Sequence, residues 1–141
     1  MVEPDRVRSK LGRLEEYLRG LDEKRTCTRT QYRSDRDLQD IVERRFEKAV
    51  QASLDIAAHV VSSEGFREPR NYGDLFVILG EEGILDEKTK EEMTEMAGFR
   101  NVLAHDYADI VDDRVYDHLQ DISRFRRFAV AIDEYLETVD D

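Results

Sequence analysis

Apolar residues recur along most of this chain at spacings of three and four, which is the repeat of an amphipathic helix. The first such segment, residues 4–23, begins with Pro4, a residue suited to a first helical turn. Its apolar stripe consists of Val7, Leu11, Leu14, Leu18 and Leu21. Residues 24–33 are polar and rich in Thr and Arg, and this stretch is predicted to be a connector.

The longest apolar pattern predicts a helix that begins at Ser34 as its N-cap and runs to about Ser62. Gly65 and Pro69 follow it and end it. The apolar positions form a wide face, so this helix is expected at the centre of a bundle. They are Ile41, Val42, Phe46, Ala49, Val50, Leu54, Ile56, Ala57, Val60 and Val61.

Three more helices are predicted, over residues 72–82, from Asp86 onward, and over residues 112–139. His118 lies opposite the apolar stripe of the last one and is expected on the surface. No segment shows the period of two that strands require. The predicted fold class is all-α, an antiparallel bundle of four to five helices, and a length of 141 residues predicts a single domain.

The charge balance narrows the possible partners. Asp and Glu outnumber Lys and Arg by 33 to 22, which gives a net charge of -11 and a pI near 4.8. Broad binding to nucleic acid needs many cations, so any RNA contact should be local. Most of the cations are arginines, which suggests either adaptation to concentrated salt or an ordinary acidic protein. The single cysteine, the lack of an apolar leader and the short apolar runs predict a cytoplasmic protein with no membrane contact.

A helical bundle rich in carboxylates raises the possibility of a metal site. The Glu-x-x-His pairs of di-metal bundles do not occur in the sequence. Asp55 and His59 are four residues apart and would share one helix face, yet no further ligands follow at a matching spacing. No Gly-rich phosphate loop occurs either. We therefore expect no metal and no cofactor, and a bundle metalloenzyme is a weak alternative.

The stretch "FRNVLAHDY", residues 99–107, combines a guanidinium, a carboxamide, an imidazole and a phenol. Cleavage of RNA without a metal needs a base for the 2′-OH, an acid for the leaving oxygen and a cation for the phosphorane. His105 can serve the first two roles and Arg100 the third. Five residues apart, they would point ~140° apart on a regular helix. Either the helix ends near Ala104 or the site combines two chains; a capping or ion-pair role is the plainer alternative.

In these residues the sequence resembles the HepT-like toxins of the HEPN superfamily, whose hallmark is Arg-x4-His-x-Tyr. Arg100, His105 and Tyr107 match it, Asn101 fits the polar residue after the Arg, and the resemblance extends over residues 38–136. It implies an endoribonuclease toxin that cleaves tRNA or mRNA as a homodimer. It also implies an MNT-type nucleotidyltransferase antitoxin that silences the toxin by AMPylation of Tyr107.

On this interpretation Arg100 and His105 are catalytic, and Asn101 and Tyr107 position the phosphate or ribose. Other cations near the expected site are candidates for RNA binding, with ion pairing to the abundant carboxylates as the alternative role for each. They are Arg44, Arg45, Arg124, Arg126 and Arg127. The alternative function is a non-catalytic module that binds the nucleotidyltransferase through its acidic surface.

Overall fold

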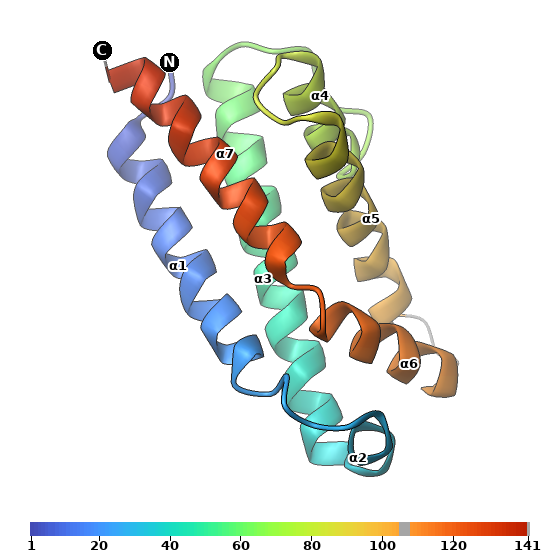
Figure 1. Cartoon of the computed structure of the whole chain (residues 1–141). Coiled ribbons are helices and arrows are strands. Elements are labelled where there is room, and N and C mark those ends of the chain that lie inside the picture. The colour runs from blue at the N-terminus through green and yellow to red at the C-terminus, as the bar shows by residue number, and fades with distance from the viewer. Residues whose placement is uncertain (105–107, 141) are drawn as a thin grey trace.

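The computed structural model describes residues 1–104 and 108–140, and the side chains of residues 1–103 and 111–139. Within these ranges every regular element is a helix (Figure 1). The helices are α1 (Pro4–Asp22), α2 (Arg29–Ser34), α3 (Arg36–Ser63), α4 (Asp74–Glu81), α5 (Glu87–Ala104), α6 (Ala108–Leu119) and α7 (Ser123–Asp140). The predicted all-α class is confirmed. None of these helices combines the length and the apolarity needed to cross a membrane.

The long helix α3 is the axis of the bundle, as its wide apolar face predicts. Helix α1 packs along one side of it, α4 and α5 pack against the other, and α7 lies between α1 and α5 and contacts both (Figure 1). The short helices α2 and α6 pack together near the end of the bundle away from both termini. The core consists of the stripes expected from the sequence, although Ile41, at 39% exposure, lies outside it.

The connector after α1 contains the short helix α2, which the composition did not predict. Thr28 caps this helix: its hydroxyl accepts from the Gln31 amide at 3.1 Å, and the Gln31 side chain accepts from the Thr28 amide at 2.8 Å. The cap of α3 is Asp35 rather than the expected Ser34, and its carboxylate accepts from the Leu38 amide. Ser34 is instead the last residue of α2, because the two helices adjoin.

The predicted last helix is in fact two, α6 and α7, separated by a turn at residues 120–122. Leu119, Ile122 and Phe125 are each three residues apart and all buried. A straight α-helix would carry such residues around its surface, whereas a tighter turn keeps them on one side. After the turn's change of direction, α6 packs against α2 and α3 and its His118 ring contacts Phe99 of α5. His118 is therefore buried, and the straight-helix pattern had wrongly placed it on the surface.

Candidate active site

Phe99 fixes the C-terminal part of α5 and thereby the position of Arg100. The Phe99 ring is buried, with its edge against Phe46 of α3 at 5.7 Å between centroids. On its other side it contacts the His118 ring of α6 at 4.3 Å. With Phe99 directed into the core, the next residue, Arg100, is half-buried at the surface of the bundle. The packing of three helices therefore determines where this guanidinium lies.

Arg100 lies between two open hollows. One, of about 380 Å³, is shared with Arg44, Lys48 and Gln51 of α3. The other, of about 570 Å³, is shared with Tyr72 and with Asn101. The Arg100 guanidinium carbon is 5.5 Å from the centre of the Tyr72 ring, a cation–π distance. Among the described residues, no carboxylate lies within ion-pair distance of Arg100.

The loop before α4 holds Tyr72 in place through Asp74. The Asp74 carboxylate accepts two hydrogen bonds from Arg67, at 2.7 and 2.9 Å, and one from the Arg70 amide at 2.9 Å. The Asp74 amide in turn donates to the Asn71 side chain at 2.9 Å. These bonds, from Arg67 first, lower the pKa of Asp74 to about 2. The aromatic ring beside Arg100 is thus carried by a fixed turn.

Two of the four motif residues can be located. Arg100 and Asn101 are adjacent on α5 and line the same hollow, with Asn101 exposed. His105 and Tyr107 lie outside the described residues, between the last residue of α5 and the first of α6. Their predicted roles, and the predicted convergence of Arg100 with His105, therefore stay predictions.

The two candidate RNA-binding arginines of α3 differ in their surroundings. Arg44 is exposed, lines the hollow next to Arg100 and makes a long ion pair with Glu47, at 3.8 Å. Arg45 points toward α1, where it donates to the Gly20 carbonyl at 2.5 Å and lies 3.6 Å from Glu23. Arg44 is thus placed near the candidate site, and Arg45 joins two helices.

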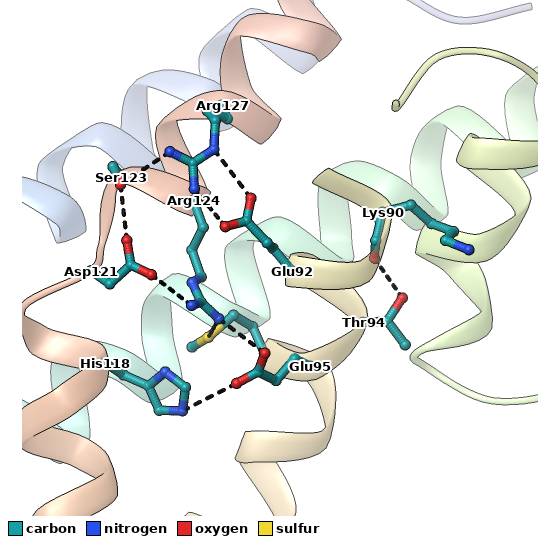
Figure 2. Close-up of polar contacts among 10 residues, drawn as sticks. Lys90, Glu92, Thr94, Glu95, His118, Asp121, Ser123, Arg124 and Arg127 are labelled. Atoms are coloured by element: carbon teal, nitrogen blue, oxygen red, sulfur yellow. Dashed lines mark hydrogen bonds and ion pairs between the residues drawn. The ribbon is translucent and has the colours of Figure 1, made fainter. Parts of the chain in front are cut away.

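The candidate arginines of α7 all make ion pairs that join helices. Arg124 and Arg127 bridge to α5, where Glu95 is 3.4 Å from Arg124 and Glu92 is 2.6 Å from Arg127 (Figure 2). Arg126 bridges to α1 through Glu15 at 3.2 Å and Asp22 at 2.7 Å. Each guanidinium is neutralised within the bundle, as in the alternative role considered for them.

His118 forms part of the same group in Figure 2, with Nε2 3.9 Å from Glu95. Burial lowers the pKa of His118, and the nearby Arg124 acts in the same direction. The Nε2 atom of His59 lies 3.4 Å from the Ser63 hydroxyl, one turn further along α3. Across the residues whose positions are given, no three His, Cys, Asp or Glu side chains are grouped to hold a metal ion.

The sequence interpretation missed two residues beside Arg100. The predicted helix over residues 72–82 included Tyr72, but α4 begins at Asp74 and Tyr72 stands in the turn before it. Its neighbours Asn71 and Gly73 are residues typical of turns. Lys48 follows Arg44 by four residues and so shares its helix face. Both signals were present in the sequence, although neither alone indicates a site.

The bundle has the fold of the HEPN toxins. A solved structure of the tri-AMPylated HEPN toxin of Shewanella oneidensis in complex with an MNT antitoxin matches it with a TM-score of 0.76, covering 94% of this chain and 98% of that chain at 24% identity. Residues 10–132 match the family described as ribonuclease HepT-like. The chain belongs to this family.

Two relatives have named activities. The mRNA nuclease HepT of Shewanella oneidensis is 30% identical over 100 residues, 68% of this chain and 75% of the relative. The tRNA nuclease HepT of Aphanizomenon flos-aquae is 26% identical over 141 residues, 99% of this chain and 96% of the relative. The resemblance first found in residues 38–136 thus extends, in the second relative, to almost the whole chain.

Proposed function

We propose that this chain is the toxin of a toxin–antitoxin pair and acts as a metal-independent endoribonuclease at a site built around Arg100. The observation that carries the proposal is the position of this guanidinium, half-buried between two hollows with no carboxylate partner in the described part of the chain. In an acidic protein whose other arginines are mostly ion-paired, such a cation is suited to bind a phosphate. The nuclease activity named for two relatives supports this choice.

In the proposed reaction, the imidazole of His105 in one chain takes the proton from a ribose 2′-OH, and the 2′-oxygen attacks the adjacent phosphorus. The guanidinium of Arg100 donates hydrogen bonds to the non-bridging oxygens, where negative charge accumulates in the phosphorane. The bond from phosphorus to the 5′-oxygen then breaks, and that oxygen takes a proton from the protonated imidazole of a His105. The products are a 2′,3′-cyclic phosphate and a 5′-hydroxyl end. Asn101 and Tyr107 position the phosphate or ribose.

We propose a homodimer in which the motif segments of both chains face one cleft. Five residues correspond to ~140° of rotation, so Arg100 and His105 would not meet on one phosphate if the helix continued through His105. Helix α5 ends at Ala104, and a two-fold axis near the motif would let Arg100 of one chain act with His105 of the other.

The proposed partner is an MNT-type nucleotidyltransferase that transfers AMP to Tyr107. Support comes from a relative of the same fold, described as tri-AMPylated and in complex with an MNT antitoxin. A phosphate on Tyr107 would bring negative charge and bulk near Arg100, where the RNA phosphate should bind. Modification would thus occupy the site and prevent cleavage.

Cleavage of a single-stranded RNA in EDTA tests the activity. The wild-type protein should cut it and leave 2′,3′-cyclic phosphate ends, whereas Arg100→Ala and His105→Ala should lower the rate by at least about 100-fold while remaining folded. Arg36→Ala, an exposed arginine at the start of α3, is the control and should keep full activity. Full activity in His105→Ala, or cleavage that needs a metal, would contradict the mechanism.

Coexpression with the nucleotidyltransferase encoded beside the gene tests the regulation. Intact-mass measurement should find added AMP, peptide mapping should assign it to Tyr107, and the modified protein should not cut RNA. Tyr107→Phe should stay unmodified. If the protein binds the nucleotidyltransferase but never cuts RNA in either form, a non-catalytic interaction module is the better description.

A further inference from the structure

Three hollows adjoin along one surface of the bundle and lead to Arg100. The first, of about 200 Å³, lies between α1 and α3. It shares Lys48 and Gln51 with the second, which is the 380 Å³ hollow beside Arg100. The second shares Arg100 with the third, beside Tyr72. Because neighbouring hollows have lining residues in common, they lie next to one another along the surface.

The side chains along this path follow the helix repeat on two neighbouring helices. On α1, the second and third members follow the first by three and seven residues. On α3, the later members follow the first by four, seven and eleven residues. Each set therefore lies on one helix face. The sets are Lys10, Arg13 and Tyr17 on α1, and Arg44, Lys48, Gln51 and Asp55 on α3. The eleven residues from Arg44 to Asp55 correspond to about 16 Å of helix. We call these residues, together with Arg100, the α1–α3 track.

The charges along the track contrast with those elsewhere. Five cations line it, with Glu47 and Asp55 as the acids in the same hollows. Of these acids, Glu47 is 3.8 Å from Arg44, and Asp55 accepts a hydrogen bond from Gln51. Lys10, Arg13 and Lys48 have no carboxylate within ion-pair distance among the residues with described side chains. The track therefore has more cations than acids, in a chain whose net charge is -11.

Two tyrosines accompany the cations. The Lys48 ammonium is 5.7 Å from the centre of the Tyr17 ring, and Arg100 is 5.5 Å from that of Tyr72. Cations with aromatic faces between them are the surface that single-stranded nucleic acid binds, through its phosphates and its unstacked bases. An acidic protein partner would need the cations but not the tyrosines, so the path fits RNA better.

We infer that the α1–α3 track binds the backbone of single-stranded RNA and guides it to Arg100. The stretch of α3 from Arg44 to Asp55, about 16 Å, is longer than one nucleotide, so the track extends beyond the scissile phosphate. The inference rests on the proposed function for the identity of the ligand and adds a substrate site away from the motif. It also predicts that the protein prefers unpaired RNA long enough to span the track, because a shorter ligand would not reach Lys10 and Arg13.

Binding of a fully 2′-O-methylated RNA of about ten nucleotides tests the track without cleavage, because this ligand has no 2′-OH to attack. The variant Lys10→Glu/Arg13→Glu should raise the Kd, measured by fluorescence anisotropy, at least tenfold at low salt. The slope of log Kd against log salt should fall by about 1.4, since each lost phosphate contact on a single strand removes about 0.7. The matched variant Lys24→Glu/Lys88→Glu makes the same change in charge off the track and should change the Kd less than threefold.

Equal Kd values for the two double variants would overturn the inference. So would an unchanged RNA affinity in Lys10→Glu/Arg13→Glu combined with loss of self-association by sedimentation, or of binding to the nucleotidyltransferase, because the track would then be a protein interface. Track-dependent binding by a protein that cuts no RNA would support the inference and contradict the proposed function. Normal cleavage with track-independent binding would do the reverse.

Discussion

Tyr72 exposes 64% of its surface, although its ring is large and apolar. The ring is carried by the hydrogen-bonded turn before α4 and lies beside the guanidinium that we propose to hold the phosphate. A base next to the scissile phosphate could stack on its open face, and such stacking contributes about 1–3 kcal/mol per base. The exposed ring is therefore suited to bind substrate rather than to stabilise the fold.

Tyr72→Ala should raise the KM for single-stranded RNA about tenfold and change kcat less than twofold, because stacking holds the substrate without taking part in proton transfer. Steady-state cleavage kinetics would measure both constants. Tyr72→Phe keeps the ring and should behave like the wild-type protein. A loss in Tyr72→Phe as large as in Tyr72→Ala would assign the role to the hydroxyl instead.

Asp74 should stabilise the protein only while it is ionised. Its pKa is lowered to about 2 by Arg67 and the Arg70 amide, against an ordinary value of about 3.9 in the unfolded chain. Its contribution is complete above about pH 4 and is lost as the pH falls toward 2. Asp74→Asn should lower the Tm by about 3–5 °C at pH 7. The difference from the wild-type protein should shrink below pH 4 in thermal melts followed by circular dichroism.

Glu68→Gln is the control for this variant, because it removes a carboxylate from the same loop. Its side chain makes no ion pair within the described residues, and its Tm at pH 7 should stay within about 1 °C of the wild-type value. A difference between Asp74→Asn and the wild-type protein that persists unchanged to pH 2 would show that the carboxylate acts through its shape and not its charge.

At the level of elements, the apolar repeat predicts the helices that fill the core but not where a helix changes direction. The α6–α7 turn contains no Gly or Pro, and its signal, three apolar residues each three apart, also fits a continuous helix. Helix α2 had a sequence signal, since Thr28 and Gln31 have the spacing of a capping box. At six residues it is too short to show an apolar period. Composition alone therefore indicated a loop.

The α6–α7 turn makes the stability depend on His118. Burial lowers the pKa of this histidine below its ordinary value near 6.5, with Arg124 and Arg114 acting in the same direction and Glu95 and Asp117 opposing them. As the pH falls below 6.5, the unfolded chain binds the proton first, so the folded protein loses stability. His118→Phe should reduce the fall in Tm between pH 7 and 5, measured by differential scanning calorimetry.

His59→Phe is the comparison for His118→Phe. Burial also lowers the pKa of His59, but this residue is half-buried beside Arg6 and Lys10 and does not contact the aromatic core. The His59→Phe substitution should reduce the pH dependence of the Tm less than His118→Phe does. The reverse order would mean that the α5–α6 contact tolerates a charged imidazole.

At the scale of the whole molecule, the sequence predicted the location of the candidate site but not its surroundings. Arg100 and Asn101 stand out because their types and spacing suit phosphate chemistry, and this needs no three-dimensional information. The path from Lys10 to Arg100 could not be predicted from spacing, because it depends on which faces of α1, α3 and α5 adjoin. The ion pairs could not be predicted either. The sequence does not show that Arg126 is bound to Glu15 and Asp22, or that Lys48 has no carboxylate within ion-pair distance among the described side chains.

A protein with a net charge of -11 that binds RNA by a local path should respond steeply to salt. Four contacts to phosphate, from Lys10, Arg13, Lys48 and Arg100, predict a slope of about 3 for log KM against log salt on a long RNA. For a dinucleotide substrate, which reaches only Arg100, the slope should be about 0.7. Initial rates between about 50 and 300 mM KCl would measure both. Equal slopes would mean that no phosphate beyond the scissile one is bound.

Ion pairs neutralise Arg126, Arg127 and Arg67, and this affects how many times the protein would cut a long RNA in one encounter. Because these arginines are neutralised by carboxylates in a chain with a net charge of -11, they attract little RNA away from the α1–α3 track. Both halves of a cleaved strand should therefore leave before the next event. A time course on a long RNA should accumulate singly cut molecules throughout the population before any molecule is cut twice, the pattern of a distributive nuclease.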